Sequence, residues 1–267
     1  MLMLRTVVAT RYVVPLREGG SLPGVVEADD DGLYVVKFHG AGQGPKALVA
    51  ETLAGELGRA LGLPVPELVV VDLDPALGAA EPDPEVQELL ERSPGRNLGM
   101  DFLPGALALG APANAGISPE LAADVVWFDA LVTNVDRTPR NPNLLLWHRR
   151  LYLIDHGAAL YAQHSWSGAP GEIERAARSR FPAIGNHVLL PIAGSIAEAD
   201  ARLAPRLDEA AIQAVVDLIP EEWLTDAPPF AAAAEHRAAY ARFLTERLAA
   251  RAWVAEAEAA RGRAADG

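Results

Sequence analysis

The chain has 267 residues, which is long enough for a large buried core in one or two domains. Half of the residues are hydrophobic and 22% are charged, a composition typical of a folded globular protein rather than a disordered one. The net charge of −13 argues against direct nucleic-acid binding and against an anionic-membrane surface, because phosphate groups would repel such a protein.

Cysteine is absent, which excludes disulfide bonds and thiolate zinc sites and fits a reducing compartment. The first residues, MLMLRTVVATRYVVPL, are interrupted by Arg5 and Arg11, so they read as a strand rather than a signal peptide. The rest of the sequence contains no run of about 18 apolar residues, the length that is needed to span a membrane. We therefore expect a cytoplasmic protein without a membrane segment.

Strands dominate the expected structure of roughly the first hundred residues. Apolar and β-branched runs predict strands at 6–14, 33–38, 68–73 and 98–105. Between them, segment 45–61 has leucines at helical spacing, begins at Pro45 and stops at Gly62, so it predicts a helix. Residues 74–97, with several prolines around a short helical piece, read as a surface insertion.

The second part of the chain is mainly helical. Ser118 and Pro119 give a helix start signal, and the helix should run to about Thr133. Two short strands follow, joined by a tight turn at 148–150, and the segment 228–260 predicts one long helix. The expected fold is therefore α+β in two lobes: a β-rich N-lobe with one helix at 1–103 and a helical C-lobe at 104–267.

The loop 134–143 carries the strongest chemical signal. It holds three of the six asparagines of the chain, together with Asp136. Asp136 and Asn141 are five residues apart, and Asp155 ends the second strand of the following hairpin. Because a hairpin of two short strands returns to its start, we expect Asp155 to lie beside Asn141.

Three converging oxygen-bearing side chains suit Mg²⁺, which prefers hard oxygen ligands. A phosphoryl-transfer site needs a carboxylate that orients the attacking hydroxyl, and an amide and a carboxylate that hold the metal. The pattern therefore predicts Asp136 as catalytic base and Asn141 and Asp155 as metal ligands. The alternative is that Asn134 and Asp136 only make turn hydrogen bonds and that Asp155 caps a loop.

Lysine is scarce, and this makes Lys37 a candidate for the same site. Only two of the 23 basic residues are lysines. Lys37 shares an apolar strand face with Val35, so it needs an anionic partner. Glu51 lies near the start of the next helix, and a strand lysine paired with a helix glutamate positions ATP phosphates in kinases. Glu56 is a second carboxylate on that helix, and helical phase does not separate the two.

Other groups give weaker signals. The glycine-containing turn 19–24 precedes the Lys37 strand, and glycine lets backbone N–H groups approach phosphates. Lys46 follows several glycines without the spacing of a phosphate-binding P-loop, so we interpret that stretch as a flexible connection. His39 and His156 have no metal-ligand spacing and read as ordinary polar positions near the cleft.

Three longer segments carry a family resemblance: SLPGVVEAD with YVVKF, AETLAGELGRALGLPVPE, and WFDALVTNVDRTPRNPNLLLWHRRLYLIDHGAAL. They resemble the HipA-like kinases, a bacterial branch of the protein-kinase-like fold, over roughly residues 5–165. The resemblance implies an ATP- and Mg²⁺-dependent kinase with Asp136 as base and with Asn141 and Asp155 on the metal. It also implies that Lys37 holds the α- and β-phosphates.

The same resemblance implies the remaining nucleotide contacts. Glu51 would be the partner of Lys37. The hinge over the adenine would be formed by Met100, Asp101, Phe102 and Leu103. Gly24 and Ser21 fall in the turn over the phosphates, and Ser21 lies where HipA proteins carry a regulatory autophosphorylated serine.

The acceptor is not readable from the residues, and three readings stay open. The main one is a serine/threonine protein kinase. A small-molecule or lipid kinase is the second, because phosphoinositide kinases share the Asp-Arg-x-x-x-Asn and Asp-x-Gly pattern. A nucleotide-binding pseudokinase or scaffold is the third, although such proteins usually lack a residue of the set present here. HipA itself has an additional N-terminal subdomain and a DNA-binding antitoxin, and a chain that begins almost at the kinase core argues against that partner.

Overall fold

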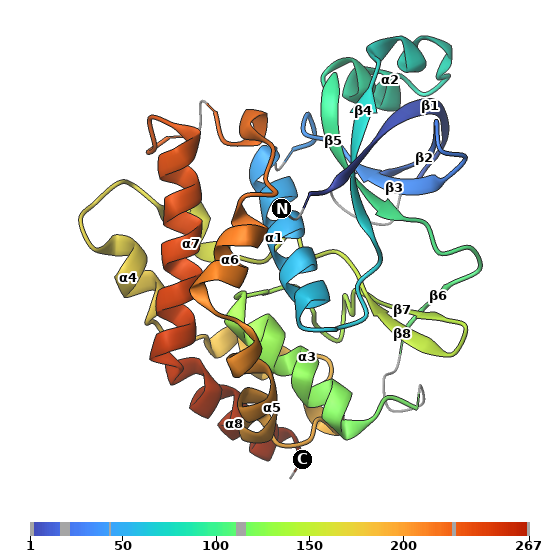
Figure 1. The fold of residues 1–267 in the computed structure, drawn as a ribbon. Helices are drawn as coiled ribbons and strands as arrows, with labels where there is room; N and C mark the ends of the chain where they lie inside the picture. The colour runs from blue at the N-terminus through green and yellow to red at the C-terminus, as the bar shows by residue number, and fades with distance from the viewer. Residues whose placement is uncertain (1–2, 17–21, 43, 111–115, 226–227, 266–267) are drawn as a thin grey trace.

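The computed structural model describes residues 3–16, 22–42, 44–110, 116–225 and 228–265. Strands form most of the first part and helices most of the second, so the expected α+β class is confirmed (Figure 1). Among the residues described, no helix is both long and apolar enough to cross a membrane.

A closed five-stranded barrel forms the first part. Its strands are β1 (Arg5–Pro15), β2 (Gly24–Ala28), β3 (Leu33–Lys37), β4 (Leu68–Leu73) and β5 (Gly95–Asp101). They are ordered β1-β2-β3-β5-β4, and the parallel pairing of β4 with β1 closes the barrel, which removes free sheet edges. Along β3, Tyr34 and Val36 fill the barrel core while Val35 and Lys37 face the other way.

The segment expected to be a surface insertion helps to fill the barrel. It forms a 3₁₀ helix, η1 (Pro75–Ala80), and a short helix, α2 (Pro84–Glu91). Val86, Leu89 and Leu90 of α2 are buried in the barrel core. The interpretation as a surface insertion was therefore wrong, because three apolar side chains at helical spacing give this piece a buried face.

Helix α1 (Pro45–Ala60) follows the barrel strand that carries Lys37. It starts at Pro45 and ends in a Schellman motif, in which Gly62 has φ +80° and the Leu63 N–H bonds to the Gly58 carbonyl at 2.9 Å. Its apolar side chains belong to the core of the helical part, not to the barrel core. Figure 1 shows α1 beside α6 and below the barrel. The helix thus joins the two parts.

The helical part is built around helix α3 (Pro119–Leu131), which Ser118 caps through its Oγ and the Leu121 N–H at 3.1 Å. A small sheet is formed by β6 (Leu107–Ala108), β7 (Leu144–Trp147) and β8 (Arg150–Leu153). The remaining α-helices are α4 (Glu172–Ala177), α5 (Ile196–Leu203), α6 (Glu209–Val216), α7 (Ala233–Ala250) and α8 (Ala252–Ala265). Further 3₁₀ turns are η3 (Tyr161–Ser165), η4 (Pro182–Asn186), η5 (Leu190–Ile192), η6 (Ala204–Arg206) and η7 (Glu221–Trp223).

The expected single helix over 228–260 is two helices. Arg251 adopts a left-handed conformation with φ 49°, which separates α7 from α8. The break lets Trp253 turn inward, where its ring packs edge-on against Trp127 at 5.3 Å and its Nε1–H bonds to the Arg247 carbonyl at 3.0 Å. Burying this large ring offsets the modest cost of one residue in the left-handed region.

Candidate active site

Lys37 and Glu51 form an ion pair between β3 and α1. The Lys37 Nζ donates to Glu51 Oε2 at 2.5 Å, and the glutamate side chain is only 1% exposed. Burial alone would raise the pKa of Glu51, but the charge of Lys37 and the hydrogen bond and charge of His156 together hold that pKa well below its usual range. Glu56 instead lies 3.3 Å from Arg59. The structure therefore pairs Lys37 with Glu51 and not with the competing carboxylate.

Asp155 is the second partner of Lys37. Its Oδ1 accepts from the same Nζ at 2.5 Å, and its side chain remains 45% exposed. Burial lowers the pKa of Lys37, but the charges of Glu51 and Asp155 raise it by more. The pKa of Lys37 therefore lies above its usual value, and the ammonium stays charged. Asp155 has φ 55°, a conformation that non-glycine residues adopt at a cost, and such strain clusters at functional sites.

The loop after α3 brings Asp136 together with its asparagines. Asp136 Oδ2 accepts from Asn141 Nδ2 at 2.7 Å and from Asn143 Nδ2 at 3.3 Å. The Asp136 N–H donates to Asn134 Oδ1 at 3.1 Å. The loop therefore fixes both the backbone and the carboxylate of Asp136.

The β7–β8 hairpin returns to the end of loop 134–143, as expected, but Asp155 contacts Lys37 rather than Asn141. Leu144 pairs with Leu153, and the Ile154 N–H donates to the Asn143 carbonyl at 3.1 Å, which places Asp155 one residue further along. Within the part of the chain that the structure describes, Asp155 makes no hydrogen bond to Asn141. Its direct partner is Lys37.

A cleft of about 840 Å³ lies over Lys37 and Asp155. Its wall is mostly apolar, as in many small-molecule sites. The barrel contributes Val35 and Leu98, and the β7–β8 hairpin contributes Leu145 and Ile154. Pro23 lines this cleft and Gly24 does not, and a side chain at Gly24 would collide with the ring of Tyr12. Ser21 lies outside the described residues.

All four predicted hinge residues, Met100 to Leu103, line the cleft. The backbone N–H of Asp101 is used by the Glu67 carbonyl at 2.8 Å, and that of Phe102 by the Leu33 carbonyl at 2.9 Å. The Leu103 N–H has no acceptor among the described residues. Within the part of the chain that the structure describes, the cleft wall therefore has a free backbone donor at Leu103.

His156 was missed as a functional residue. It is fully buried, its Nδ1 lies 3.3 Å from Glu51 Oε1, and its ring meets Phe128 edge-on at 6.1 Å. Glu51 is thus held from both oxygens, by His156 and by Lys37. The signal was the Asp-His-Gly sequence directly after an apolar strand. His39 lies outside the cleft lining: its backbone N–H donates to Asn97 Oδ1 at 3.0 Å, and its Nε2 lies 3.0 Å from the Pro94 carbonyl.

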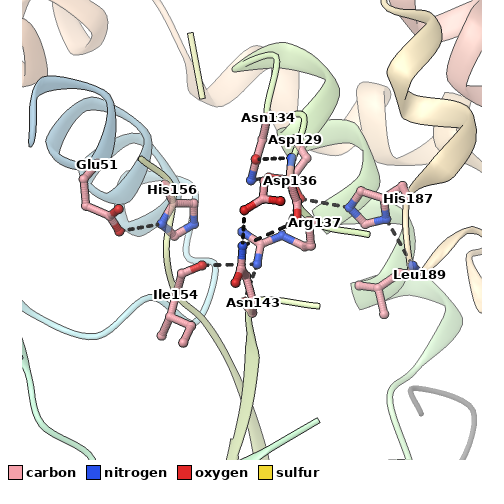
Figure 2. A network of polar contacts seen from close by, with 10 residues as sticks. All are labelled: Glu51, Asp129, Asn134, Asp136, Arg137, Asn143, Ile154, His156, His187 and Leu189. Carbon is pink, nitrogen blue, oxygen red and sulfur yellow. Dashed lines mark hydrogen bonds and ion pairs between the residues drawn. The ribbon is translucent and has the colours of Figure 1, made fainter. Parts of the chain in front are cut away.

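A buried polar network lies behind the Asp136 loop (Figure 2). Asp129 of α3 accepts from Arg137 Nε at 2.5 Å, from His187 Nε2 at 2.9 Å and from Asn134 Nδ2 at 3.1 Å. Burial raises the pKa of Asp129, but the charge of Arg137 and the hydrogen bond from His187 together lower it by more. The net pKa lies well below the usual range, so the carboxylate is ionised. The sequence distance of 58 residues hid the contact with His187.

The network predicts an acid-sensitive fold. Burial lowers the pKa of His187, so between about pH 6.5 and its folded pKa the unfolded chain binds a proton that the folded chain does not. Stability should therefore fall as the pH drops from 7.5 to 5.5. Glutamine can keep the donor to Asp129, so urea unfolding of His187→Gln at both pH values should show a smaller loss than wild type. An identical loss in both proteins would contradict this origin.

Two solved kinase structures resemble this chain. The crystal structure of the Helicobacter pylori proinflammatory kinase CtkA is 15% identical and matches 96% of this chain and 97% of that chain, with a TM-score of 0.49. The Golgi casein kinase with Mn/ADP bound is 13% identical over 93% of this chain and 72% of that one, with a TM-score of 0.47. Likeness at this level carries no residue-by-residue argument, and none of the curated proteins matches the sequence.

The family is shown by the sequence itself. The family model described as HipA-like kinase matches residues 10–254, which is most of the chain. A strand barrel beside a helical part, with the cleft lined by residues of both, is the two-lobed arrangement expected for such a kinase. The chain therefore belongs to the HipA-like kinase family and is a kinase.

Proposed function

We propose that this kinase transfers the γ-phosphate of ATP, with Mg²⁺, to a serine or threonine hydroxyl of a protein. The observation that carries the proposal is the position of Lys37. Its ammonium group bridges Glu51 and Asp155 at 2.5 Å each, in the wall of an 840 Å³ cleft. A strand lysine paired with a buried helix carboxylate, beside a half-exposed aspartate, supports a phosphate-transfer site of the protein-kinase kind.

The cleft fits a nucleotide base and its phosphates. Apolar side chains of Val35, Leu98 and Leu145 offer surfaces for the flat base, and the free Leu103 N–H offers a hydrogen bond to a ring nitrogen. Lys37 lies within the same cleft, so a bound triphosphate would lie toward it and away from the hinge. Glu51, held by His156, keeps Lys37 extended into the cleft.

The donor set fits a hard divalent cation such as Mg²⁺. Asn141 uses its Nδ2 on Asp136, which leaves its Oδ1 without a partner among the described residues. Asp155 has its Oδ2 without a partner over the same ranges. Both are oxygen donors, which Mg²⁺ prefers. When bound, the metal would neutralise charge on the phosphate oxygens.

Asp136 is our candidate for the base that orients the acceptor hydroxyl. Its Oδ2 takes hydrogen bonds from two asparagine side chains, which fix the position of the carboxylate. The carboxylate does not line the cleft, which supports a role toward the acceptor rather than toward ATP. Proton transfer of this kind contributes about 10²–10⁴-fold to rate.

Replacing Lys37 by arginine tests whether the site needs a compact ammonium. The planar guanidinium cannot take the same point between Glu51 and Asp155, so transfer should fall roughly 10²-fold although the charge is kept. Lys46→Arg is a matched control, because among the described residues the Lys46 ammonium donates only to the Gln163 carbonyl, at 3.3 Å. Initial rates at saturating ATP give the comparison. Full activity of Lys37→Arg would remove Lys37 from the site.

The acceptor class is tested by phosphoamino-acid analysis. Wild type and Asp155→Asn are incubated with labelled ATP, Mg²⁺ and a mixed protein and peptide substrate pool. We expect label on phosphoserine or phosphothreonine with wild type and none above background with Asp155→Asn. Label confined to small molecules or lipid would reject the protein-kinase assignment and favour the second reading, a small-molecule or lipid kinase.

A further inference from the structure

The buried network behind the Asp136 loop is built around one charge pair. Arg137 is 1% exposed, and Asp129, its only carboxylate partner among the described residues, is fully buried. An unpaired guanidinium in such a place would be strongly destabilising, so Arg137 and Asp129 are expected to stay together. The pair forms no part of the cleft lining. Any effect of the pair on the cleft therefore has to pass through other residues.

Arg137 connects this pair to both ends of the β7–β8 hairpin. Its Nη1 donates to the Asn143 carbonyl and, more weakly, to the Ile154 carbonyl at 3.4 Å. Asn143 contacts the Asp136 carboxylate, and Ile154 directly precedes Asp155. One side chain thus holds the backbone next to both candidate catalytic carboxylates.

Asp129 also reaches Asp136 by a second route. Its Oδ1 accepts from Asn134 Nδ2 at 3.1 Å, and Asn134 Oδ1 accepts the Asp136 N–H at 3.1 Å. Because the amide of Asn134 gives one hydrogen to Asp129 and takes another from the backbone, its orientation is fixed. The Asp136 backbone is therefore tied to α3 through a single side chain.

His187 closes the network from the far side. Its Nδ1 accepts from the Leu189 N–H at 3.1 Å, so the proton is on Nε2, which donates to Asp129 Oδ2 at 2.9 Å. The neighbouring Val188 N–H donates to the Arg137 carbonyl at 3.1 Å. Segment 187–189 thus orients both members of the charge pair.

We propose that Asp129 and His187 are positioning residues for phosphate transfer. They hold Arg137 and Asn134, and through these two side chains they keep Asp136 and Asp155 in register. The proposal rests on the function proposed above. Since neither residue touches the cleft, their loss should lower the turnover rate and leave nucleotide affinity unchanged.

Substitutions at His187 test this without removing the buried carboxylate. His187→Phe fills the site but loses both hydrogen bonds, and we expect turnover to fall 10- to 100-fold with the Kd of an ATP analogue changed less than threefold. His187→Gln can donate to Asp129 and accept from Leu189, and it should stay within threefold of wild-type turnover. Asp129→Asn, which strands the Arg137 charge, should have a larger effect than His187→Phe where it folds.

A matched control comes from α3, the helix that carries Asp129. Trp127→Phe removes the Nε1–H bond to Asp200 Oδ1 at 2.9 Å, two residues from Asp129. It should lower the melting temperature as His187→Phe does and keep wild-type turnover. Equal turnover in His187→Phe and Trp127→Phe would show that His187 is only structural. Turnover lost equally in the Phe and Gln variants would show that its hydrogen bonds do not matter.

Amide hydrogen exchange gives a readout that does not depend on activity. In His187→Phe, peptides covering 134–143 and 150–156 should exchange faster, with α3 unchanged. If wild type itself transfers no phosphate, the proposed function fails, and faster exchange in these peptides still supports the positioning role. Unchanged exchange in both peptides would overturn the inference.

Discussion

Asp136→Ala should reduce phosphate transfer about 10³-fold while leaving the Kd for ATP unchanged. The carboxylate lies outside the cleft lining, so its removal takes away no nucleotide contact. It removes the acceptor of the Asn141 and Asn143 amides. Asn141 is exposed, so its amide can turn to water, and the buried Asn143 amide keeps the Asp136 backbone carbonyl at 3.5 Å. The loss is therefore expected in the turnover number, measured at saturating ATP, rather than in binding.

Asp217→Ala is the control for losing an acidic group from this protein. Asp217 is exposed at the end of α6, where it accepts from Gln213 at 2.8 Å, and its loss should leave transfer unchanged. If Asp136→Ala retains more than a tenth of wild-type turnover, Asp136 is not the base. The pseudokinase reading would gain if wild type and Asp136→Ala were equally inactive while both bind ATP.

Arg247→Met should destabilise the folded protein strongly. Arg247 is fully buried in α7, and five hydrogen bonds join it to backbone carbonyls of Ala130, Leu131, Ala177 and Ser179. Burial lowers its pKa to about 9, so it is still charged at neutral pH. Removing it leaves several buried acceptors unsatisfied, at about 1–3 kcal/mol each.

The expected loss is about 4 kcal/mol in the free energy of unfolding, or a fall of about 10 °C in melting temperature. Arg242→Met is the control on the same helix, because Arg242 is 63% exposed and pairs with Glu174 at the surface. Exposed pairs contribute at most about 1 kcal/mol. Equal melting temperatures for the two variants would show that the carbonyl contacts of Arg247 contribute little.

The position of Arg247 also explains how the C-terminal end of α3 is held in place next to the candidate site. Ala130 and Leu131 are the last residues of α3, whose final carbonyls have no partner within the helix. Arg247 supplies those partners at 2.7–3.1 Å, just before the chain enters the Asp136 loop. The loop therefore starts from a fixed helix end.

Much of the candidate site follows from local pattern. Alternation along one strand placed Lys37 on the cleft side, and the hairpin after loop 134–143 brought Asp155 back to the level of that loop. Both rest on neighbours in the sequence, where periodicity of two residues or a tight turn decides the geometry. The pairing of Lys37 with Glu51 rather than Glu56 needed the packing of α1 against the helical part.

Contacts between distant segments were not predictable in the same way. The parallel pairing of β1 with β4 closes the barrel, and no local pattern specifies it. His187 reaches Asp129 from a short segment between 3₁₀ turns, and polar residues in such segments usually read as solvent-exposed. The break at Arg251 likewise depends on the pocket that Trp127 offers to Trp253.

The most direct test of the account is transfer of labelled γ-phosphate from ATP by the wild-type chain, with and without Mg²⁺, beside Asp155→Asn. Asp155 is the residue that joins the Lys37 pair to the proposed metal site. We predict transfer by wild type only when Mg²⁺ is present, and a loss of at least 10²-fold in Asp155→Asn. Transfer that is equal in Asp155→Asn and wild type, or that persists without divalent metal, would contradict it.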